Sequence, residues 1–477
     1  MTDAPSSPNP RRKTKIICTL GPATESPEAL RALITAGADV FRLNMSHARH
    51  DWVRSVVKQI RSLSAELGTL TGILLDTQGP AIRTGDLHTN LQLKPGDVFE
   101  FTVRGEKSME VASVDVNYEG LVNDISVGDI VLVDNGVIHM KVLAKEINRI
   151  RCEVLTKGTL GSRRHINLPG VRVNLPPLTE KDLADIELGV SVGVDFVALS
   201  FCRGASDIME LRRVLGESGS AARVVAKIED QHAVKSLLEI IDASDAVMVA
   251  RGDLGIECPM EELPIIQRRI VKRCIERGRQ VIVATHMLES MIENPLPTRA
   301  EITDVANAVF EQADAIMLSG ETAVGKYPAV AVSVLDRVAR RIERTGGLNF
   351  AQFAETQTPR QKTVRAAIEL ANSIQGSKII LFTKRGFMAD HFSQMRPHKA
   401  PIYAFTPSQE VAHRLALNWG VTAIVMPFDL RPEFTIAEAE KLLLARGCVS
   451  TGDQVIVLTD VVVGPERFDS VQLRRIP

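Results

Sequence analysis

Short apolar runs, mostly of β-branched residues, alternate along much of the chain with longer segments of helical periodicity. Residues 27–37, for example, carry apolar side chains at Leu30, Leu33 and Ile34, which fall on one face of a helix that ends at Gly37. The apolar runs begin at residues 15, 39, 72, 195, 223, 246, 280 and 315. The pattern predicts eight strands, each followed by a helix, and eight is the number of units in a (β/α)8 barrel.

The rhythm changes between the third and fourth of these strands. Apolar and polar residues there alternate singly, with Pro-Gly-Asp and Gly-Asp turns between the segments, a pattern typical of antiparallel β structure. Beyond residue 346, a helical segment precedes apolar runs at residues 378–383, 401–406, 421–426 and 453–460. These runs predict an open, mostly parallel α/β sheet.

The predicted fold class is therefore α/β. It consists of a (β/α)8 TIM barrel, an inserted lid domain shaped as a small β-barrel, and a C-terminal open α/β domain. The expected division is a disordered tail at residues 1–12, the barrel at 13–85 and 169–345, the lid at 86–168, and the C-terminal domain at 346–477.

The composition narrows the classes of function. The 57 basic and 58 acidic residues give a formal net charge of −1, which argues against binding to nucleic acid or a membrane surface through bulk charge. No apolar run reaches membrane-spanning length, and the N-terminus has no hydrophobic signal region. The six cysteines form no CxxC pair, which suggests reduced thiols in a cytoplasmic protein.

Charged residues follow two of the apolar runs. Lys227 and Glu229 come at the end of one run, and Arg251, Gly252 and Asp253 follow the next. Because the active sites of such barrels lie at the C-terminal ends of their strands, we expect these side chains to meet at one rim. Two carboxylates beside a lysine suit a divalent metal with a charged phosphate or carboxylate ligand. The alternative is a set of structural ion pairs at strand ends.

Oxygen-bearing side chains follow two other strands. Asn44 and Ser46 come two positions apart after Arg42, and Asp76 is followed by Thr77. Arg42 could hold a phosphate through paired hydrogen bonds, and the oxygens suit a hard cation. The alternative is a strand end that enters a turn with a capping serine.

The remaining candidates lie in loops. Arg83 stands near the start of the insertion, and Arg163 and Arg164 near its end, where a basic edge could contact nucleotide phosphates. Solvated basic loops and ordinary salt bridges are common alternatives. Thr285 ends a strand, where a threonine is more often a helix N-cap than a proton donor.

Taken in order, these motifs resemble those of pyruvate kinases, closely from residue 13 to 332 and more weakly through the C-terminal region. The resemblance rests on FRLNMSH, LDTQGPAIRTG, LGSRRHINLPG, AKIED, RGDLG, ATHMLESM, PTRAEITDVANAV and MLSGETAVGKYP. It implies a cytoplasmic, homotetrameric enzyme that transfers the phosphoryl group of phosphoenolpyruvate to ADP. It implies Mg²⁺ (or Mn²⁺) and K⁺ as cofactors, and no nucleic-acid or membrane partner.

The resemblance also implies a role for each candidate. Arg42 would bind the substrate phosphate, and Lys227 would contact the phosphoryl group during transfer. Glu229 and Asp253 would hold Mg²⁺, the backbone of Gly252 and Asp253 would meet the substrate carboxylate, and Thr285 would belong to the relay that protonates the enolate. The K⁺ ligands would be Asn44, Ser46, Asp76 and Thr77, and the nucleotide would meet Asn44, His47, Arg83 and Arg164.

Three positions depart from the family pattern. The family commonly has Lys, Glu and Gln where this chain has Gln78, Ala81 and His286. In the family, an acidic residue at the position of Ala81 accompanies dependence on K⁺, so we expect weak or altered K⁺ dependence here. In the C-terminal domain, Phe387 and Met388 replace the small hydroxyl residues of the usual sugar-phosphate loop. Fructose 1,6-bisphosphate is therefore not the expected effector.

Two other hypotheses fit parts of the sequence. A Mg²⁺-dependent lyase acting on a pyruvate enolate would share Glu229 and Asp253, but it would not need Arg83 and Arg164. A non-catalytic relative would explain the three departures, although the set of Arg42, Lys227, Glu229, Asp253 and Thr285 is intact.

Overall fold

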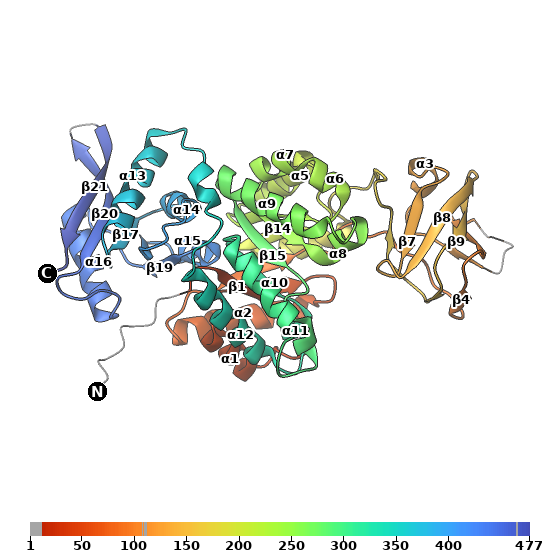
Figure 1. The fold of residues 1–477 in the computed structure, drawn as a ribbon, viewed down its shortest axis with the longest axis horizontal. Coiled ribbons are helices and arrows are strands. Elements are labelled where there is room, and N and C mark those ends of the chain that lie inside the picture. Colours follow the sequence, from red (N-terminus) through yellow and green to blue (C-terminus); the bar gives the residue numbers. More distant parts are fainter. Residues whose placement is uncertain (1–11, 107, 109–111, 464–465) are drawn as a thin grey trace.

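The computed structural model describes residues 12–106, 108, 112–463 and 466–477 (Figure 1). Of the predicted tail at residues 1–12, all but Arg12 lie outside the described residues.

A closed barrel of eight parallel strands forms the centre of the molecule. Their order around the barrel is β1-β16-β15-β14-β13-β12-β3-β2. Almost every residue in these strands is buried, because helices cover their outer faces and side chains fill the interior. The strands are β1 (Lys15–Thr19), β2 (Val40–Asn44), β3 (Gly72–Asp76), β12 (Phe196–Leu199), β13 (Arg223–Ile228), β14 (Ala246–Ala250), β15 (Gln280–Ala284) and β16 (Ala315–Leu318).

Local signals in the sequence set where several barrel helices begin and end. Thr179 and Thr298 form capping boxes, and Gly37 ends the first helix in the left-handed conformation at φ 112°. The barrel helices are α1 (Pro27–Ala36), α2 (His50–Glu66), α4 (Glu180–Ser191), α5 (Ala205–Glu217), α6 (Gln231–Lys235), α7 (Leu237–Ala243), α8 (Arg251–Glu257), α9 (Leu263–Arg277), η1 (Glu289–Ile292), α10 (Arg299–Phe310), α11 (Gly320–Ala323) and α12 (Pro328–Glu343).

The lid lies between β3 and α4 and has a hydrophobic core of its own. Its strands form a six-stranded sheet, β11-β7-β8-β9-β5-β6, and a two-stranded sheet, β10-β4. The elements are β4 (Leu91–Leu93), β5 (Val98–Thr102), β6 (Ser113–Asp115), α3 (Leu121–Asp124), β7 (Ile130–Val133), β8 (Ile138–Lys145), β9 (Arg149–Val154), β10 (Gly158–Leu160) and β11 (Ile166–Asn167).

The C-terminal domain is a five-stranded sheet in the order β19-β18-β17-β20-β21. Four strands are parallel, whereas the last, β21, pairs antiparallel with β20 and was not predicted from the sequence. The elements are η2 (Phe350–Phe353), α13 (Pro359–Ser373), β17 (Lys378–Phe382), α14 (Phe387–Gln394), β18 (Ile402–Thr406), α15 (Gln409–Arg414), η3 (Leu415–Leu417), β19 (Val421–Val425), α16 (Pro432–Ala445), β20 (Gln454–Val463) and β21 (Glu466–Arg475).

The lid and the C-terminal domain lie at opposite ends of the barrel (Figure 1). A fully buried ion pair joins the barrel to the C-terminal domain, with Arg396 Nη2 2.7 Å from Asp314 Oδ2. A second pair joins Arg223, at the start of β13, to Asp390 on α14. The predicted fold class, with its barrel, inserted lid and C-terminal α/β domain, is confirmed. None of the helices among the described residues is both long enough and apolar enough to cross a membrane.

Candidate functional site

A polar cavity of about 340 Å³ lies where the C-terminal ends of the barrel strands face the lid. It brings together nine of the predicted site residues, namely Arg42, Asn44, Ser46, Thr77, Arg83, Arg164, Lys227, Glu229 and Asp253. Charged groups from separate strands therefore converge on one rim of the barrel, as the sequence predicts.

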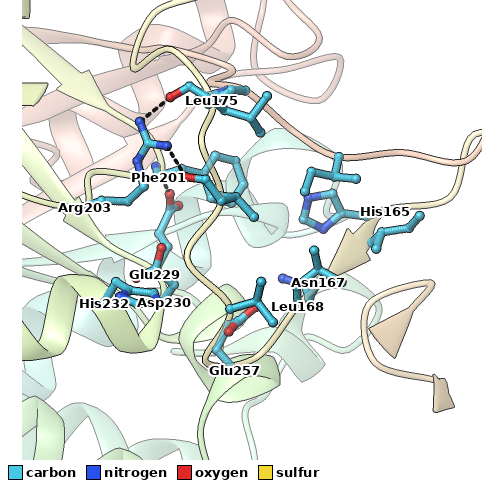
Figure 2. Close-up of a pocket in the computed structure, with 15 residues that line it drawn as sticks. His165, Asn167, Leu168, Leu175, Phe201, Arg203, Glu229, Asp230, His232 and Glu257 are labelled. Atoms are coloured by element: carbon cyan, nitrogen blue, oxygen red, sulfur yellow. Dashed lines mark hydrogen bonds between the residues drawn. The ribbon is translucent and has the colours of Figure 1, made fainter. Parts of the chain in front are cut away.

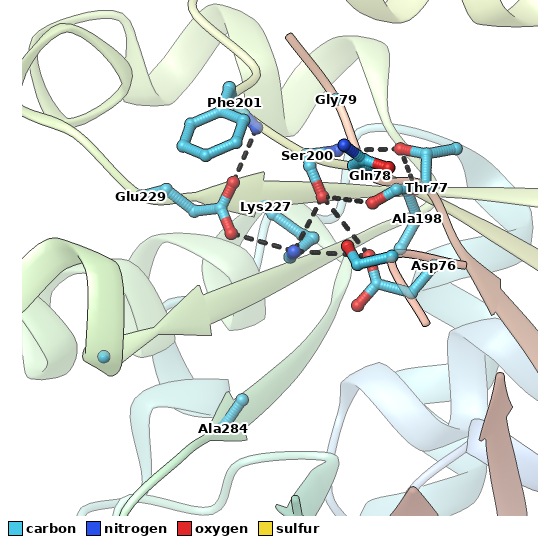
Figure 3. Close-up of polar contacts among 12 residues, drawn as sticks. Asp76, Thr77, Gln78, Gly79, Ala198, Ser200, Phe201, Lys227, Glu229 and Ala284 are labelled. Atoms are coloured by element: carbon cyan, nitrogen blue, oxygen red, sulfur yellow. Dashed lines mark hydrogen bonds and ion pairs between the residues drawn. The ribbon is translucent and has the colours of Figure 1, made fainter. Parts of the chain in front are cut away.

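Lys227 is the centre of the polar network in this cavity (Figure 3). Its Nζ lies 2.7 Å from Ser200 Oγ, 2.8 Å from Glu229 Oε1 and 3.2 Å from Asp76 Oδ1. Burial alone would lower the pKa of Lys227, but the carboxylates of Asp76 and Glu229 outweigh it and raise that pKa above its ordinary value. Lys227 is therefore a fixed cation that points toward the cavity.

Asp76 is the shared counter-ion of two cations. It has no exposed side-chain surface, and Arg42 Nε lies 2.6 Å from its second oxygen. Burial would raise the pKa of Asp76, but Lys227 and then Arg42 lower it, so the carboxylate stays ionised. Asp76 thus holds both Arg42 and Lys227 in place from below the cavity.

Glu229 and Asp253 supply two carboxylates to the same wall. The backbone N–H of Phe201 donates to Glu229 Oε2 at 2.6 Å. Burial raises the pKa of Glu229 and Asp253 adds to this effect, while Lys227 opposes it. A nearby cation would therefore favour the ionised form of Glu229.

The two carboxylates fit a divalent cation that takes its other ligands from substrate and water, as Mg²⁺ usually does. Among the described residues there is no group of three or more His, Cys, Asp or Glu side chains suited to a metal.

Asn44, Ser46 and Thr77 form an oxygen-bearing part of the wall beside Arg42. Asn44 lies opposite Asp76 in the register of β2 and β3, so these groups are neighbours across the sheet. The Ser46 N–H donates to Asn44 Oδ1 at 3.2 Å, and Thr77 Oγ1 donates to the Ala198 carbonyl at 3.0 Å. Oxygen donors of this kind suit a monovalent or hard divalent cation, although both oxygens of Asp76 are engaged by Lys227 and Arg42.

Thr285 lies in a turn whose backbone conformation is uncommon for residues other than glycine. Thr285 and His286 both have left-handed φ angles, 66° and 54°. Thr285 Oγ1 accepts the N–H of Gly252 at 2.8 Å and donates to the Ala284 carbonyl at 2.6 Å. The hydroxyl therefore satisfies a backbone donor in the first turn of α8, next to the residue that precedes Asp253. Thr285 is not an N-cap, because Ala250 holds that position in α8 and Leu288 holds it in η1.

Arg251 braces this turn from the protein interior. Its Nε donates to the Ala284 carbonyl at 3.1 Å, and its Nη1 lies 2.7 Å from Asp304 Oδ1. Neither Gly252 nor Thr285 is among the residues that line the 340 Å³ cavity, although the adjacent Asp253 is.

The lid side contributes three further basic residues to the cavity, Arg83, Arg163 and Arg164. Arg164 Nη1 lies 3.2 Å from Asp134 Oδ1, Arg163 pairs with Asp86, and Arg83 Nη1 donates to the Arg163 carbonyl at 3.3 Å. Arg83, Arg163 and Arg164 thus face the same opening. His47, in contrast, is exposed and is not part of the cavity wall.

A smaller cavity of about 60 Å³ lies where the lid linkers meet the barrel (Figure 2). Arg203 donates to the carbonyls of Val173 and Leu175 at 3.0 and 2.6 Å, which fixes the returning linker to the barrel. Burial raises the pKa of Glu257, on the opposite wall, to about 7. Since Glu229 also lines this space, the lid hinge and the larger cavity share a wall.

The sequence analysis did not single out several residues of the site. Ser200 binds Lys227, and Phe201, with φ 53°, binds Glu229 through its backbone. Both follow β12, so the rule that polar groups at strand ends face the site could have found Ser200. Asp134, Asn135 and His165 come from the lid, and their approach depends on domain packing that no local pattern reports.

Comparison with known proteins matches most of the chain to pyruvate kinases. The model of the pyruvate kinase barrel domain matches residues 11–332, and that of the pyruvate kinase alpha/beta domain matches residues 361–473. The chain is 42% identical to plastidial pyruvate kinase 2 of Arabidopsis thaliana, over 99% of this chain and 82% of that protein. It is 40% identical to a pyruvate kinase of Sporosarcina psychrophila, over 95% and 78%. A crystal structure of a pyruvate kinase from Cryptosporidium parvum matches with a TM-score of 0.92 and 34% identity, covering 98% of this chain and 96% of that one.

Proposed function

Because this chain belongs to the pyruvate kinase family, we propose that the residues around Lys227 carry out both steps of the family reaction. The chain is a phosphotransferase that converts phosphoenolpyruvate and ADP into pyruvate and ATP, the last reaction of glycolysis. The observation that supports the assignment of residues is the placement of Lys227 between two buried carboxylates, on a wall shared with Arg42 and Asp253.

In the first step, the bond between the phosphorus and the enol oxygen breaks as an oxygen of the ADP β-phosphate bonds to phosphorus. Arg42 would hold the phosphoryl oxygens by paired hydrogen bonds, and Lys227 would neutralise charge on them during transfer. Because Asp76 fixes both cations, they need little rearrangement in the transition state.

Glu229 and Asp253 are the proposed Mg²⁺ ligands, and Mn²⁺ would use the same oxygens. The bound ion would supply positive charge to the phosphoryl oxygens. The backbone N–H groups of Gly252 and Asp253 would meet the substrate carboxylate. Since the Gly252 N–H donates to Thr285 Oγ1 in this structure, substrate binding would exchange that partner.

In the second step, the enolate left behind takes a proton at its terminal carbon. Thr285 is the proposed member of the relay that delivers this proton, directly or through water. Arg83 and Arg164 would contact the phosphates of ADP, with Asn44 and His47 beside them. The lid that carries Arg164 would also exclude water, which would otherwise accept the phosphoryl group.

Removal of divalent metal tests this assignment directly. In an assay that couples pyruvate formation to a second enzyme, the purified chain with phosphoenolpyruvate and ADP should turn over with Mg²⁺. It should lose nearly all activity with a chelator and regain it with excess Mg²⁺ or Mn²⁺. Full activity in the chelated sample would contradict the metal role of Glu229 and Asp253. A Mg²⁺-dependent lyase or a non-catalytic relative would produce no ATP in any of these samples.

Asn44, Ser46, Asp76 and Thr77 are the proposed K⁺ ligands. Ala81 lines the same cavity and brings no charge to it. We expect the rate without K⁺ to stay within about tenfold of the rate with K⁺. Ala81 stands where the family commonly has a glutamate, so one carboxylate fewer lies near the cation site. Ala81→Glu should increase the rate with K⁺ relative to the rate without K⁺. Ala112→Glu in the lid is the matched control. A strict requirement for K⁺ in the unaltered chain would contradict this expectation.

The homotetramer and the cytoplasmic location implied by the resemblance are also part of the proposal. Light scattering on the purified chain tests the first, and fractionation of the source cells tests the second.

A further inference from the structure

Phe201 orients one of the two proposed metal ligands. Its backbone N–H donates to Glu229 Oε2 at 2.6 Å, while Glu229 Oε1 lies 2.8 Å from Lys227 Nζ (Figure 3). Both carboxylate oxygens therefore have partners, and the Phe201 N–H determines where the second oxygen points. Groups that bind a metal ligand in this way hold it in place, and their loss weakens metal binding. The position of Phe201 should therefore affect the affinity of the site for a divalent cation.

The backbone of Phe201 is in a conformation that few residues with a side chain adopt. Its φ angle is 53°, which lies in the left-handed region where glycine is most at ease. A conformation of this kind persists only where the surrounding contacts hold it. The contacts of the Phe201 ring therefore help to keep the Phe201 N–H directed at Glu229.

One contact of the Phe201 ring is with a segment that is fixed to the barrel. A Cβ atom at Gly79 would lie 2.9 Å from Phe201 Cδ2, so the ring packs directly against the backbone there. The N–H groups of Gln78 and Gly79 donate to Asp182 Oδ1 at 3.0 and 3.1 Å. Asp182 belongs to the capping box that begins α4, so this contact moves with the barrel.

A second contact of the Phe201 ring comes from the lid. The rings of His165 and Phe201 lie beside each other, with their centroids 5.8 Å apart and an angle of 39° between their planes (Figure 2). His165 immediately precedes β11, and it forms an isolated β-bridge with Arg83 between the segments that leave and re-enter the barrel. Movement of these paired segments therefore moves the His165 ring against Phe201.

The imidazole of His165 is suited to packing as an uncharged aromatic ring. Burial lowers the pKa of His165, and Arg83 adds to this effect while Asp253 opposes it. The ring is therefore neutral near neutral pH, and a neutral aromatic ring packs favourably against a phenyl ring. His165 lines both the smaller cavity at the lid linkers and the larger polar cavity. It thus lies between the lid hinge and the metal ligands.

We propose that His165 is a positioning residue for Glu229 and acts through the ring and the backbone of Phe201. The inference rests on the proposed function, in which Glu229 is a metal ligand. The His165 ring holds Phe201 in its left-handed conformation, so that the Phe201 N–H stays on Glu229. Without that ring, Phe201 relaxes, and the carboxylate must be reoriented before a cation binds. The affinity for the cation is then lower.

Equilibrium binding of Mn²⁺ tests the proposal without relying on turnover. Electron paramagnetic resonance measures the free Mn²⁺ in samples of the full chain with saturating phosphoenolpyruvate and no ADP. His165→Ala should weaken Mn²⁺ binding about fivefold, which is less than the roughly tenfold or more that follows loss of a direct partner of a metal ligand. His165→Phe keeps a neutral aromatic ring and should bind Mn²⁺ within about twofold of the unaltered chain.

Phe201→Gly distinguishes this route from a general loss of structure. Glycine accepts a left-handed backbone and keeps the N–H, but it removes the ring that His165 contacts. Phe201→Gly should weaken Mn²⁺ binding, and adding His165→Ala to it should cause no further loss, whereas independent effects would multiply. His88→Ala is the matched control, since His88 is an exposed histidine elsewhere in the lid, and it should leave Mn²⁺ binding unchanged.

Four results would overturn the proposal. They are Mn²⁺ binding by His165→Ala as tight as that of the unaltered chain, an equal loss in His88→Ala, a comparable loss in His165→Phe, and multiplied effects in the double variant. If His165→Ala does not fold, Phe201→Gly and His165→Phe still decide the matter, because the first should weaken binding and the second should preserve it. Failure of the proposed function itself would differ, since the unaltered chain would then neither bind Mn²⁺ nor turn over.

Discussion

Replacing Lys227 by methionine is expected to reduce turnover by at least about 10³-fold, the scale of a lost charge contact to a phosphoryl group in transfer. Methionine keeps most of the side-chain length but removes the cation that lies between Asp76 and Glu229. Steady-state rates in the coupled assay measure the loss. Titrations with Mg²⁺ and phosphoenolpyruvate should change much less, because Arg42, Glu229 and Asp253 remain.

Stability must be followed in the same variant. Glu229 is buried and would lose its partner, so the free energy of unfolding should fall by up to about 3 kcal/mol, as when one member of a buried ion pair is removed. Lys235→Met, on the exposed surface of the next helix, is the matched control and should leave both quantities unchanged. Near-normal turnover in a folded Lys227→Met protein would remove Lys227 from its proposed role.

Asp253→Asn is expected to raise the Mg²⁺ concentration for half-maximal activity by roughly tenfold or more, since a neutral amide replaces one of two carboxylate ligands. The shape of the side chain is kept, so α8 and its hydrogen bond to Thr285 should persist. The Mg²⁺ dependence of the rate at saturating phosphoenolpyruvate and ADP measures the effect.

Glu261→Gln provides the comparison for this variant. Glu261 is an exposed acid shortly after α8, and its loss changes the net charge by the same amount without touching the cavity. An Asp253→Asn protein with an unaltered Mg²⁺ titration would show that Asp253 is not a metal ligand.

The barrel could be predicted because each of its layers leaves a local signal. Strands buried on both faces read as continuous apolar runs, such as residues 246–250, and helices with one buried face repeat every three or four residues. Residues at the C-terminal ends of the barrel strands all lie at one face of the barrel. Lys227, Glu229 and Asp253 come at or just after such strand ends in the sequence, which is enough to predict that they share one rim.

Other features left no local signal. Strand β21 is a C-terminal segment in which apolar and polar residues alternate only weakly, and it pairs antiparallel with β20. The left-handed turn at Thr285 and His286 depends on Arg251 and Gly252, which are more than 30 residues earlier in the chain. Contacts between distant segments decided each of these cases.

The single carboxylate beneath Arg42 and Lys227 also constrains how this enzyme can change over generations. Asp76 balances both cations at once, so a substitution at any of the three alters the fit of the other two. Loss of Arg42 alone would draw Lys227 closer to Asp76, and loss of Asp76 would leave two buried positive charges to repel each other. Substitutions at these three positions should therefore be non-additive, so that the effect of each depends on which residues occupy the other two.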